Sequence, residues 1–234
     1  MNSNKLRKKI ICVFLPQRCK YCGGVIKPEE TLCENCEKHL PRVEKPVCFK
    51  CGRSKNDCIC KGKSMYYDRV IAPFYYTGAI EKGVRRMKFD FVESLCESYA
   101  EDMTECVRES YENARYDYVC FVPFSERDMT KRPFNQSELL ARRIADNLGL
   151  ECLDALVRLY DSDVQHQLVG KLRKGNVFGV FDLKDGISPE GKSVLLVDDI
   201  KTTGATLNEC AKMLKINGAA NVDCITFSVS KLKD

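Results

Sequence analysis

Two adjacent carboxylates, Asp198 and Asp199, directly follow four apolar residues in a row. The apolar run at 194–197 predicts a short strand that is buried on both faces, as in a parallel sheet covered by helices. Open sheets of this kind bind their ligands at the carboxyl ends of the strands, where the two aspartates would stand. Paired carboxylates at such a position suit ribose hydroxyls or a Mg²⁺ ion.

A threonine-rich loop comes directly after this segment, and its residues are Thr202, Thr203, Gly204, Ala205 and Thr206. Apolar residues then recur with helical spacing from Leu207 until Gly218, so the loop is expected to open a helix. Unpaired N–H groups at a helix N-terminus, hydroxyl groups and a glycine that permits close approach together favour a phosphate. The alternative is an ordinary helix cap after a solvated strand end.

Eight of the fifteen cysteines crowd into one short segment, in pairs separated by one or two residues. Such spacing lets both sulfurs of a pair reach one tetrahedral ion, and it predicts two structural zinc ions with four thiolates each. The predicted metal ligands are Cys19, Cys22, Cys33, Cys36, Cys48, Cys51, Cys58 and Cys60. The spacing leaves open whether the pairs combine in tandem or interleave, and the alternative to zinc is a set of disulfides or reactive thiols.

Composition and charge are those of an ordinary globular protein. The chain has 234 residues, of which 44% are hydrophobic and 30% are charged, enough for one α/β domain and a small module. The formal net charge of +5 is too small by itself to indicate a nucleic-acid partner. The many unpaired cysteines favour a reducing cytoplasm, and no apolar stretch reaches the ~18 residues of a membrane span.

Strand-like and helix-like stretches alternate after the cysteine-rich segment. Strands are expected at 66–76, 118–124, 153–159, 178–183, 194–197 and 222–229. Helices are expected at 79–111 with a break near 89–91, at 134–149 and at 207–218. The alternation predicts an α/β fold, with a parallel, doubly wound sheet flanked by helices at 65–234. The segment 1–64 would form a small zinc-ribbon module that begins with a short helix.

Two basic residues outside the threonine loop are candidates for catalysis. Lys88 ends a basic run with Arg85 and Arg86 on the first long helix, where it could meet a pyrophosphate or belong to a solvated face. Arg127 lies in a basic polar loop after the strand at 118–124. This loop is expected at the same end of the sheet as the two acids, where a departing pyrophosphate would need positive charge.

The thirteen residues 194–206 resemble the phosphoribosyl pyrophosphate (PRPP) signature of type I phosphoribosyltransferases. The resemblance implies that the two acids hold the ribose 2′ and 3′ hydroxyls and that the loop holds the 5′-phosphate. PRPP, bound with Mg²⁺, would then contact Asp198, Asp199, Lys201, Thr202, Thr203, Gly204, Ala205 and Thr206. Several purine-type members carry an aspartate that acts as general base at the position of Thr202, a role that threonine cannot fill.

Further motifs resemble the ComF/GntX family nearly from end to end. They are the cysteine-rich ribbon, Arg-Met-Lys-Phe at 86–89, Val-Pro-Phe at 122–124, Arg-Pro-Phe-Asn-Gln-Ser at 132–137 and Gln-His-Gln at 165–167. This resemblance implies a bacterial phosphoribosyltransferase-like protein of natural competence and DNA uptake, with competence proteins as partners. It also implies that 165–176 is a mobile loop over the site, in which His166 would contact the leaving group or act as a base.

The residues are compatible with more than one function. The first is a transferase in which an unknown acceptor attacks C1′ of PRPP and pyrophosphate is released, either in competence or in ordinary nucleotide synthesis or salvage. The second is a non-catalytic factor that binds single-stranded DNA through basic residues and an aromatic face. The basic candidates are Lys171, Arg173, Lys174, Arg127, Lys131 and Arg132, and the aromatic candidates are Phe134, Tyr21 and Phe49. A glutamine-dependent amidotransferase is disfavoured, because Met1 is followed by Asn2 and not by a nucleophilic cysteine.

Overall fold

The structure is a computed structural model, and it describes residues 16–60, 64–90, 93–111, 113–124, 129–130, 132–159 and 180–231. The helix expected within the first fifteen residues and the loop expected at 165–176 lie outside the described residues. The same holds for Arg127, Lys131, His166, Lys171, Arg173 and Lys174.

A six-stranded parallel sheet forms the centre of the molecule, with the strand order β1-β8-β7-β3-β4 and with β2 also paired to β8. Its strands are β1 (Arg69–Ile71), β2 (Phe74–Tyr75), β3 (Tyr118–Phe121), β4 (Glu151–Leu153), β7 (Ser193–Lys201) and β8 (Asn221–Val229). The two longest strands, β7 and β8, lie side by side and are mostly buried, as their apolar runs indicate. The predicted α/β fold with a parallel sheet is therefore confirmed.

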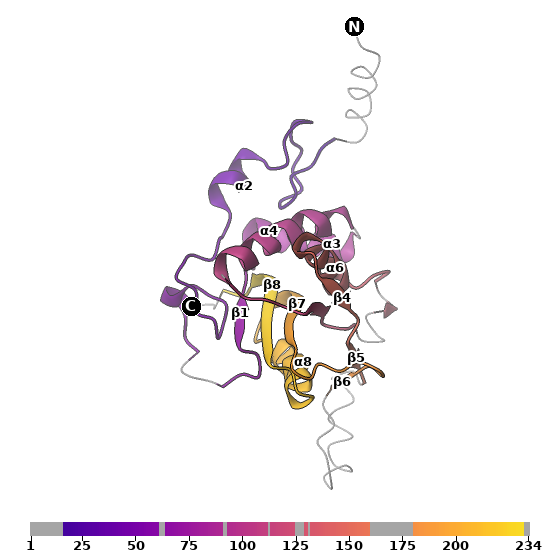
Figure 1. The fold of residues 1–234 in the computed structure, drawn as a ribbon. Helices are drawn as coiled ribbons and strands as arrows, with labels where there is room; N and C mark the ends of the chain where they lie inside the picture. Colours follow the sequence, from indigo (N-terminus) through magenta and orange to yellow (C-terminus); the bar gives the residue numbers. More distant parts are fainter. Residues whose placement is uncertain are drawn as a thin grey trace, which may run out of the picture.

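Helices cover both faces of this sheet (Figure 1). They are α3 (Gly78–Phe89), α4 (Ser94–Ser110), α6 (Gln136–Leu148) and α8 (Ala205–Ile216). Leu195 and Val197 of β7 belong to the apolar cluster of α3, α4 and α6, whereas Val194 and Leu196 belong to that of α8. This alternation is that of a strand buried on both faces. None of the described helices is long and apolar enough to cross a membrane.

The strands expected at 153–159 and 178–183 do not both join the parallel sheet, and this expectation is wrong. The first stretch is divided between β4 and β5 (Leu156–Arg158), and β5 pairs antiparallel with β6 (Phe181–Leu183) in a separate two-stranded sheet. Asp154 and Ala155 stand between β4 and β5, and both residue types are unfavourable in strands. The stretch 66–76 is also interrupted, at Pro73, which has no N–H group for a sheet.

β7 continues through both aspartates to Lys201, beyond the end expected at 197. β8 supplies the partners of this extension, with Asp198 beside Thr226 and Lys201 beside Val229. The two acids therefore lie within the last part of the strand, where sheet pairing holds their backbone.

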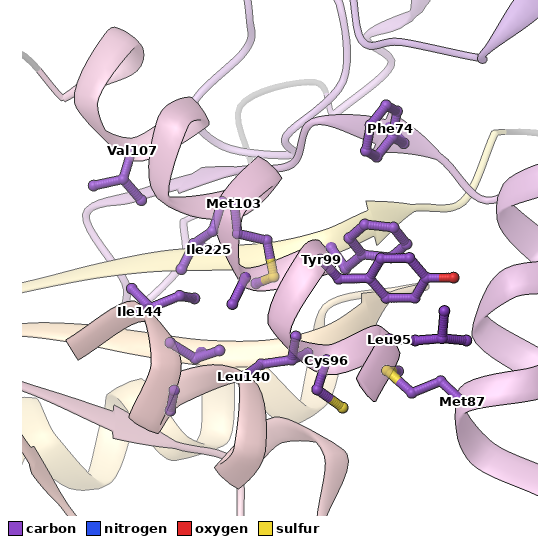
Figure 2. Close-up of a cluster of buried hydrophobic side chains, with 14 of the residues drawn as sticks. Phe74, Met87, Leu95, Cys96, Tyr99, Met103, Val107, Leu140, Ile144 and Ile225 are labelled. Carbon is purple, nitrogen blue, oxygen red and sulfur yellow. The ribbon is translucent and has the colours of Figure 1, made fainter. Parts of the chain in front are cut away.

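The first half of the cysteine-rich segment packs on the sheet through an aromatic cluster that includes Tyr99 and Phe74 (Figure 2). Tyr21 is 1% exposed, and its ring stacks on Tyr99 and lies edge-on to Phe74, with centroid distances of 5.9 and 5.4 Å. Its hydroxyl donates to Asp102 of α4 at 2.7 Å. A ring enclosed in this way cannot serve as a stacking surface for DNA bases, so this expectation for Tyr21 is wrong.

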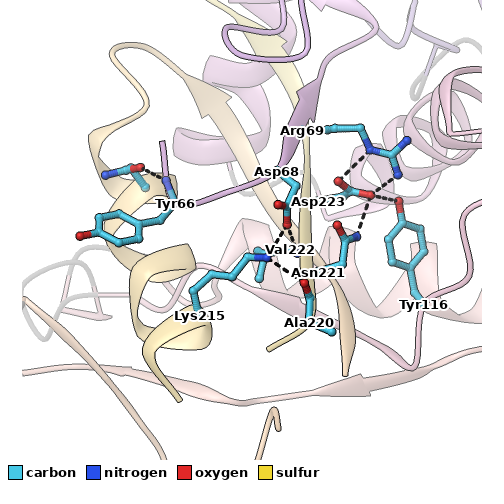
Figure 3. A network of polar contacts seen from close by, with 10 residues as sticks. Tyr66, Asp68, Arg69, Tyr116, Lys215, Ala220, Asn221, Val222 and Asp223 are labelled. Atoms are coloured by element: carbon cyan, nitrogen blue, oxygen red, sulfur yellow. Dashed lines mark hydrogen bonds and ion pairs between the residues drawn. The ribbon is translucent and has the colours of Figure 1, made fainter. Parts of the chain in front are cut away.

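A buried charge network ties the amino end of β8 to β1 (Figure 3). Asp223 is fully buried and accepts hydrogen bonds from the guanidinium of Arg69, from the hydroxyl of Tyr116 at 2.8 Å and from the side chain of Asn221 at 3.1 Å. Arg69 also lies over the ring of Tyr111, with its guanidinium carbon 4.3 Å from the centroid. Because donors surround the carboxylate, its burial is compensated, and the network is structural.

Candidate functional site

The two aspartates of β7 have different partners. Asp198 accepts through Oδ1 from the hydroxyl of Ser137 and from the backbone N–H of Asp199, both at 2.9 Å. Asp199 is 7% exposed and forms an ion pair with Lys88, with 2.5 Å between Oδ2 and Nζ. Ser137 belongs to α6 and Lys88 to the last turn of α3. Two helices from distant parts of the chain therefore hold the pair of acids.

The start of α6 sets the position of Ser137. Asn135 caps this helix, because its Oδ1 accepts from the N–H of Ser137 at 3.0 Å. Its Nδ2 donates to the carbonyl of Val122 at 3.0 Å, just after β3. The cap thereby ties α6 to the neighbouring strand, and it brings the hydroxyl of Ser137 to Asp198. The sequence did not indicate a role for Ser137. The asparagine two residues before it is a typical N-cap residue, however, and could have indicated that a helix begins here.

Lys88 contacts the carboxylate of Asp199, whereas the sequence suggested a contact with pyrophosphate. The side chains of Lys88 and Asp199 are 16% and 11% exposed, so the pair is largely shielded from water. An ammonium beside two neighbouring carboxylates offsets part of their mutual repulsion. A lysine ammonium has three donor positions, so Lys88 can hold Asp199 and still donate to a bound ligand.

The environment of the two acids shifts the protonation of Asp198. Burial and the charge of Asp199 raise the pKa of Asp198 to about 7, and the hydroxyl of Ser137 and the charge of Lys88 act in the opposite direction. A carboxyl group with such a pKa becomes ionised when a ligand brings hydroxyl donors or a cation to it. Ligand binding at this site should therefore depend on pH near neutrality.

The threonine loop follows β7 directly and opens α8. Gly204 is the N-cap of the helix with φ 84°, a left-handed conformation that glycine adopts without strain. Thr202, Thr203 and Thr206 are exposed, and the hydroxyl of Thr203 accepts from the N–H of Ala205 at 3.3 Å. The loop thus presents hydroxyl groups beside the N-terminus of a 12-residue helix, an arrangement suited to a phosphate.

Lys201 differs from the other residues expected to contact the ligand. It is 3% exposed and lies on the buried side of the loop, with its Cε 2.8 Å from the position that a Cβ on Gly204 would take. Burial lowers the pKa of Lys201, and the nearby charge of Arg53 adds to this effect. The side chain supports the loop from inside the protein, on the side away from the exposed threonines.

A cluster of aromatic and basic side chains follows α3 and β3. The guanidinium carbon of Arg132 lies 5.3 Å from the ring centroid of Phe89 and 5.8 Å from that of Phe124. Phe89 follows Lys88 directly in the chain and is 58% exposed. A cavity of about 480 Å³ lies beside this cluster, lined in part by Phe124, Arg132 and Phe134. The cluster offers flat rings and positive charge to a planar anionic ligand.

The eight cysteines of the N-terminal segment form two separate groups in tandem, which answers the question of pairing. The first group is Cys19, Cys22, Cys33 and Cys36, and the second is Cys48, Cys51, Cys58 and Cys60. The sulfur atoms of each group lie within 4.8 Å of one another, and three pairs are 3.1 to 3.6 Å apart. A disulfide bond is about 2.05 Å long, whereas Zn–S bonds of about 2.3 Å place tetrahedral sulfurs ~3.8 Å apart. Both groups therefore fit four-coordinate zinc.

Two family models match the chain. The phosphoribosyl transferase domain matches residues 133–232, and the double zinc ribbon domain matches residues 10–66. Among solved structures, an adenine phosphoribosyltransferase is 17% identical with a TM-score of 0.38, over 59% of this chain and 73% of that chain. The family models, the parallel sheet and the cysteine groups define a phosphoribosyltransferase-like protein with an N-terminal double zinc ribbon.

Relatives extend over most of the chain. DNA utilization protein YhgH of Salmonella typhimurium is 30% identical over 208 residues, which are 87% of this chain and 86% of that protein. Competence protein ComFC of Bacillus subtilis is 27% identical over 219 residues, with the same two shares. The chain belongs to the ComF/GntX family, as its motifs predicted.

Proposed function

We propose that this protein binds PRPP together with Mg²⁺ at the carboxyl end of β7 and acts in DNA uptake and natural competence. The observation that carries the proposal is the placement of Asp198 and Asp199 beside the exposed loop that opens α8. The carboxylates would accept hydrogen bonds from the ribose hydroxyls, and the loop 202–206 would bind the 5′-phosphate. The names of the relatives, which refer to competence and DNA utilization, support the biological role.

The donor set at the end of β7 also fits a magnesium ion. Mg²⁺ prefers one or two carboxylates together with phosphate oxygens and water. At the end of β7 two carboxylates stand beside the threonine loop, which would bind the phosphate. The bound ion would offset the negative charge of the diphosphate. Lys88 lowers the charge of the acids themselves, so that a polyanionic ligand can approach them.

The reaction class of the proposal is phosphoribosyl transfer, in which the bond from C1′ to pyrophosphate breaks and an acceptor takes its place. Thr202 stands where purine-type enzymes carry a general base, and a threonine hydroxyl cannot take up a proton near neutral pH. The acceptor would therefore need to be a good nucleophile without such a base. Arg127 and His166 stay candidates for contacts with the leaving group.

Calorimetric titration of the full-length protein with PRPP, with and without Mg²⁺, tests the proposal. The double variant Asp198→Asn/Asp199→Asn should weaken PRPP binding by about 2 kcal/mol or more, because each charged hydrogen bond is worth roughly 1.5–3 kcal/mol. Asp117→Asn is the matched control, since this exposed acid is paired with Lys192 just before β3. Unchanged affinity in the double variant would show that PRPP does not bind here. Pyrophosphate release with candidate bases and single-stranded DNA then tests turnover.

Single-stranded DNA is a second candidate ligand, and the cluster of Arg132, Phe89 and Phe124 favours it. Arg132 lies against two rings, one of them largely exposed, and the exposed ring, Phe89, directly follows Lys88 in the chain. Base–aromatic stacking is worth about 1–3 kcal/mol per base and tolerates any sequence. Phe89→Ala should therefore weaken binding of a single strand by about this amount. Tyr66→Ala, which removes another half-exposed ring, is the control.

The salt dependence of binding separates DNA from PRPP as the partner of the basic residues. Log affinity for a single strand should fall with log salt at a slope of about −0.7 per phosphate contact. The triple variant Lys171→Ala/Arg173→Ala/Lys174→Ala should reduce that slope by about two. PRPP should also compete with DNA where both use this edge of the sheet. Binding that is undetectable at ~50 mM salt, or a slope that the triple variant leaves unchanged, would speak against DNA.

A further inference from the structure

Two buried cations, Lys201 and Arg53, lie between the second cysteine group and the threonine loop 202–206, which is called the phosphate loop from here on. They are 3% and 6% exposed. Across the described ranges of the chain, neither of them forms an ion pair with a carboxylate. Buried cations without a counter-charge are strongly unfavourable, so a negative partner would stabilise the charged form of both residues.

Hydrogen bonds through the backbone of Ser230 connect Arg53 with Lys201, and a backbone hydrogen bond connects Arg53 with the cysteine group. The Nε of Arg53 donates to the carbonyl of Ser230 at 2.8 Å, and the N–H of Ser230 donates to the carbonyl of Lys201 at 2.9 Å. The carbonyl of Arg53 in turn accepts from the N–H of Cys48 at 2.8 Å, within the second cysteine group. The ribbon, the end of β7 and the residue after β8 therefore form one bonded unit.

The same unit contacts the buried side of the phosphate loop. The Nζ of Lys201 lies 3.2 Å, and the hydroxyl of Tyr67 3.5 Å, from the position that a Cβ on Gly204 would take. Tyr67 is 3% exposed and donates to the carbonyl of Lys50, the residue before Cys51, at 2.8 Å. The loop that would hold the 5′-phosphate thus rests on groups that are bonded to the second cysteine group.

We propose that Lys201 and Arg53 are the counter-ions of the second cysteine group in its metal-bound form, and that Lys201 couples this metal ion to the phosphate loop. Four thiolates around a divalent ion carry a net charge of −2, which two cations balance. The first group has a neighbouring cation of its own in Arg86, whose Nη1 donates to the carbonyl of Cys19 at 3.2 Å, whereas its other neighbour Lys20 is paired with Asp102 at 3.1 Å. Only the coupling to the loop rests on the proposed function.

Metal affinity tests the counter-ion role without any ribose ligand. The full-length protein is loaded with Zn²⁺ and titrated with a chelator, which removes the two metal ions in separate steps. The zinc-release step that is missing in the variant Cys58→Ser/Cys60→Ser belongs to the second group. Lys201→Met should weaken metal binding in that step by about 10- to 100-fold, as the loss of partners around metal ligands does. Lys201→Arg, which keeps the charge, should retain it, and so should Lys20→Met. Equal affinity in Lys201→Met and the native protein would overturn the proposal.

Reciprocal binding tests the coupling to the loop. If the metal ion positions the loop, saturating PRPP should strengthen metal binding in the second group by a factor in the usual range of about 5- to 150-fold. This effect should be lost in Lys201→Met and should be much smaller for the first group. A Lys201→Met variant that loses PRPP affinity but keeps its metal would assign the lysine to the ligand phosphate and overturn the proposal. If the native protein binds no PRPP, the proposed function fails, whereas the chelator titration still decides the counter-ion role.

Discussion

Replacing Lys88 by methionine tests how the charge of this lysine affects the ionisation of Asp198. The ammonium lies 2.5 Å from Asp199, and its charge lowers the raised pKa of Asp198, which stands at about 7. An opposite charge at close range lowers a carboxyl pKa by roughly 1–3, so its removal should raise the pKa of Asp198 by about 1 or more. At pH 7 a rise of the pKa from about 7 to about 8 lowers the ionised fraction of Asp198 from about one half to about one eleventh, so PRPP binding should weaken about fivefold or more.

The sign of the pH dependence follows from the chemistry of the ligand. Ribose hydroxyls donate to a carboxylate and Mg²⁺ binds it, so both favour the ionised form of Asp198. PRPP affinity should therefore rise as the pH increases through about 7 and level off above it. In Lys88→Met the same rise should occur about one pH unit higher. Calorimetry between pH 6 and 9, in buffers with different ionisation enthalpies, measures both the affinity and the protons released.

The conservative variant and a double variant identify what a negative result means. Lys88→Arg keeps the charge and should leave the midpoint near its native value. Lys88→Met/Asp199→Asn removes both charges, so it should recover stability lost in Asp199→Asn without recovering PRPP affinity. A midpoint in Lys88→Met equal to that of the native protein would refute the electrostatic role, and the ion pair would then matter for packing alone.

Metal content and stability test other parts of the structure. Protein purified without chelator should contain close to two zinc ions per chain, and less than half an equivalent by elemental analysis would contradict the zinc assignment of the cysteine groups. Asp223→Asn should lower the free energy of unfolding in urea by about 3 kcal/mol, because partly exposed Arg69 loses its charge partner, while exposed Glu34→Gln should change little. Tyr21→Ala should cost about 3–5 kcal/mol through lost packing, and Tyr21→Phe about 1 kcal/mol through one hydrogen bond. Equal stabilities of these two Tyr21 variants would show that the ring contributes little.

The parts that the sequence predicted well are those whose pattern depends on local chemistry. Four apolar residues before two acids identify β7, and the paired cysteines identify both metal groups, because neither pattern is common in a different kind of structure. For the short strands β5 and β6 the predicted sheet is wrong. A run of a few apolar residues indicates burial but does not say which strand it pairs with.

The contacts that complete the candidate site could not be read from the chain in the same way. Lys88 and Asp199 are distant in sequence, and a basic helix end predicts only that some anion is near. Lys201 stands next to the loop in the chain, which predicts a ligand contact, yet its side chain lies in the interior. Sequence spacing shows which residues are neighbours in the chain, whereas burial and partner depend on how the helices and the ribbon pack around the strand.

The two cysteine groups lie against different parts of the candidate site, and this predicts different effects of damage to each. Arg86 of α3 donates to the carbonyl of Cys19 at 3.2 Å, and a Cβ on Gly83 would lie 2.9 Å from the carbonyl oxygen of Tyr21. The first group is thus packed on the helix that carries Lys88, whereas the second is bonded to residues under the phosphate loop. Loss of the first metal ion should therefore shift the pH midpoint of PRPP binding, because Lys88 would move from Asp199. Loss of the second should weaken binding at every pH without moving that midpoint, and equal shifts from both would contradict this division.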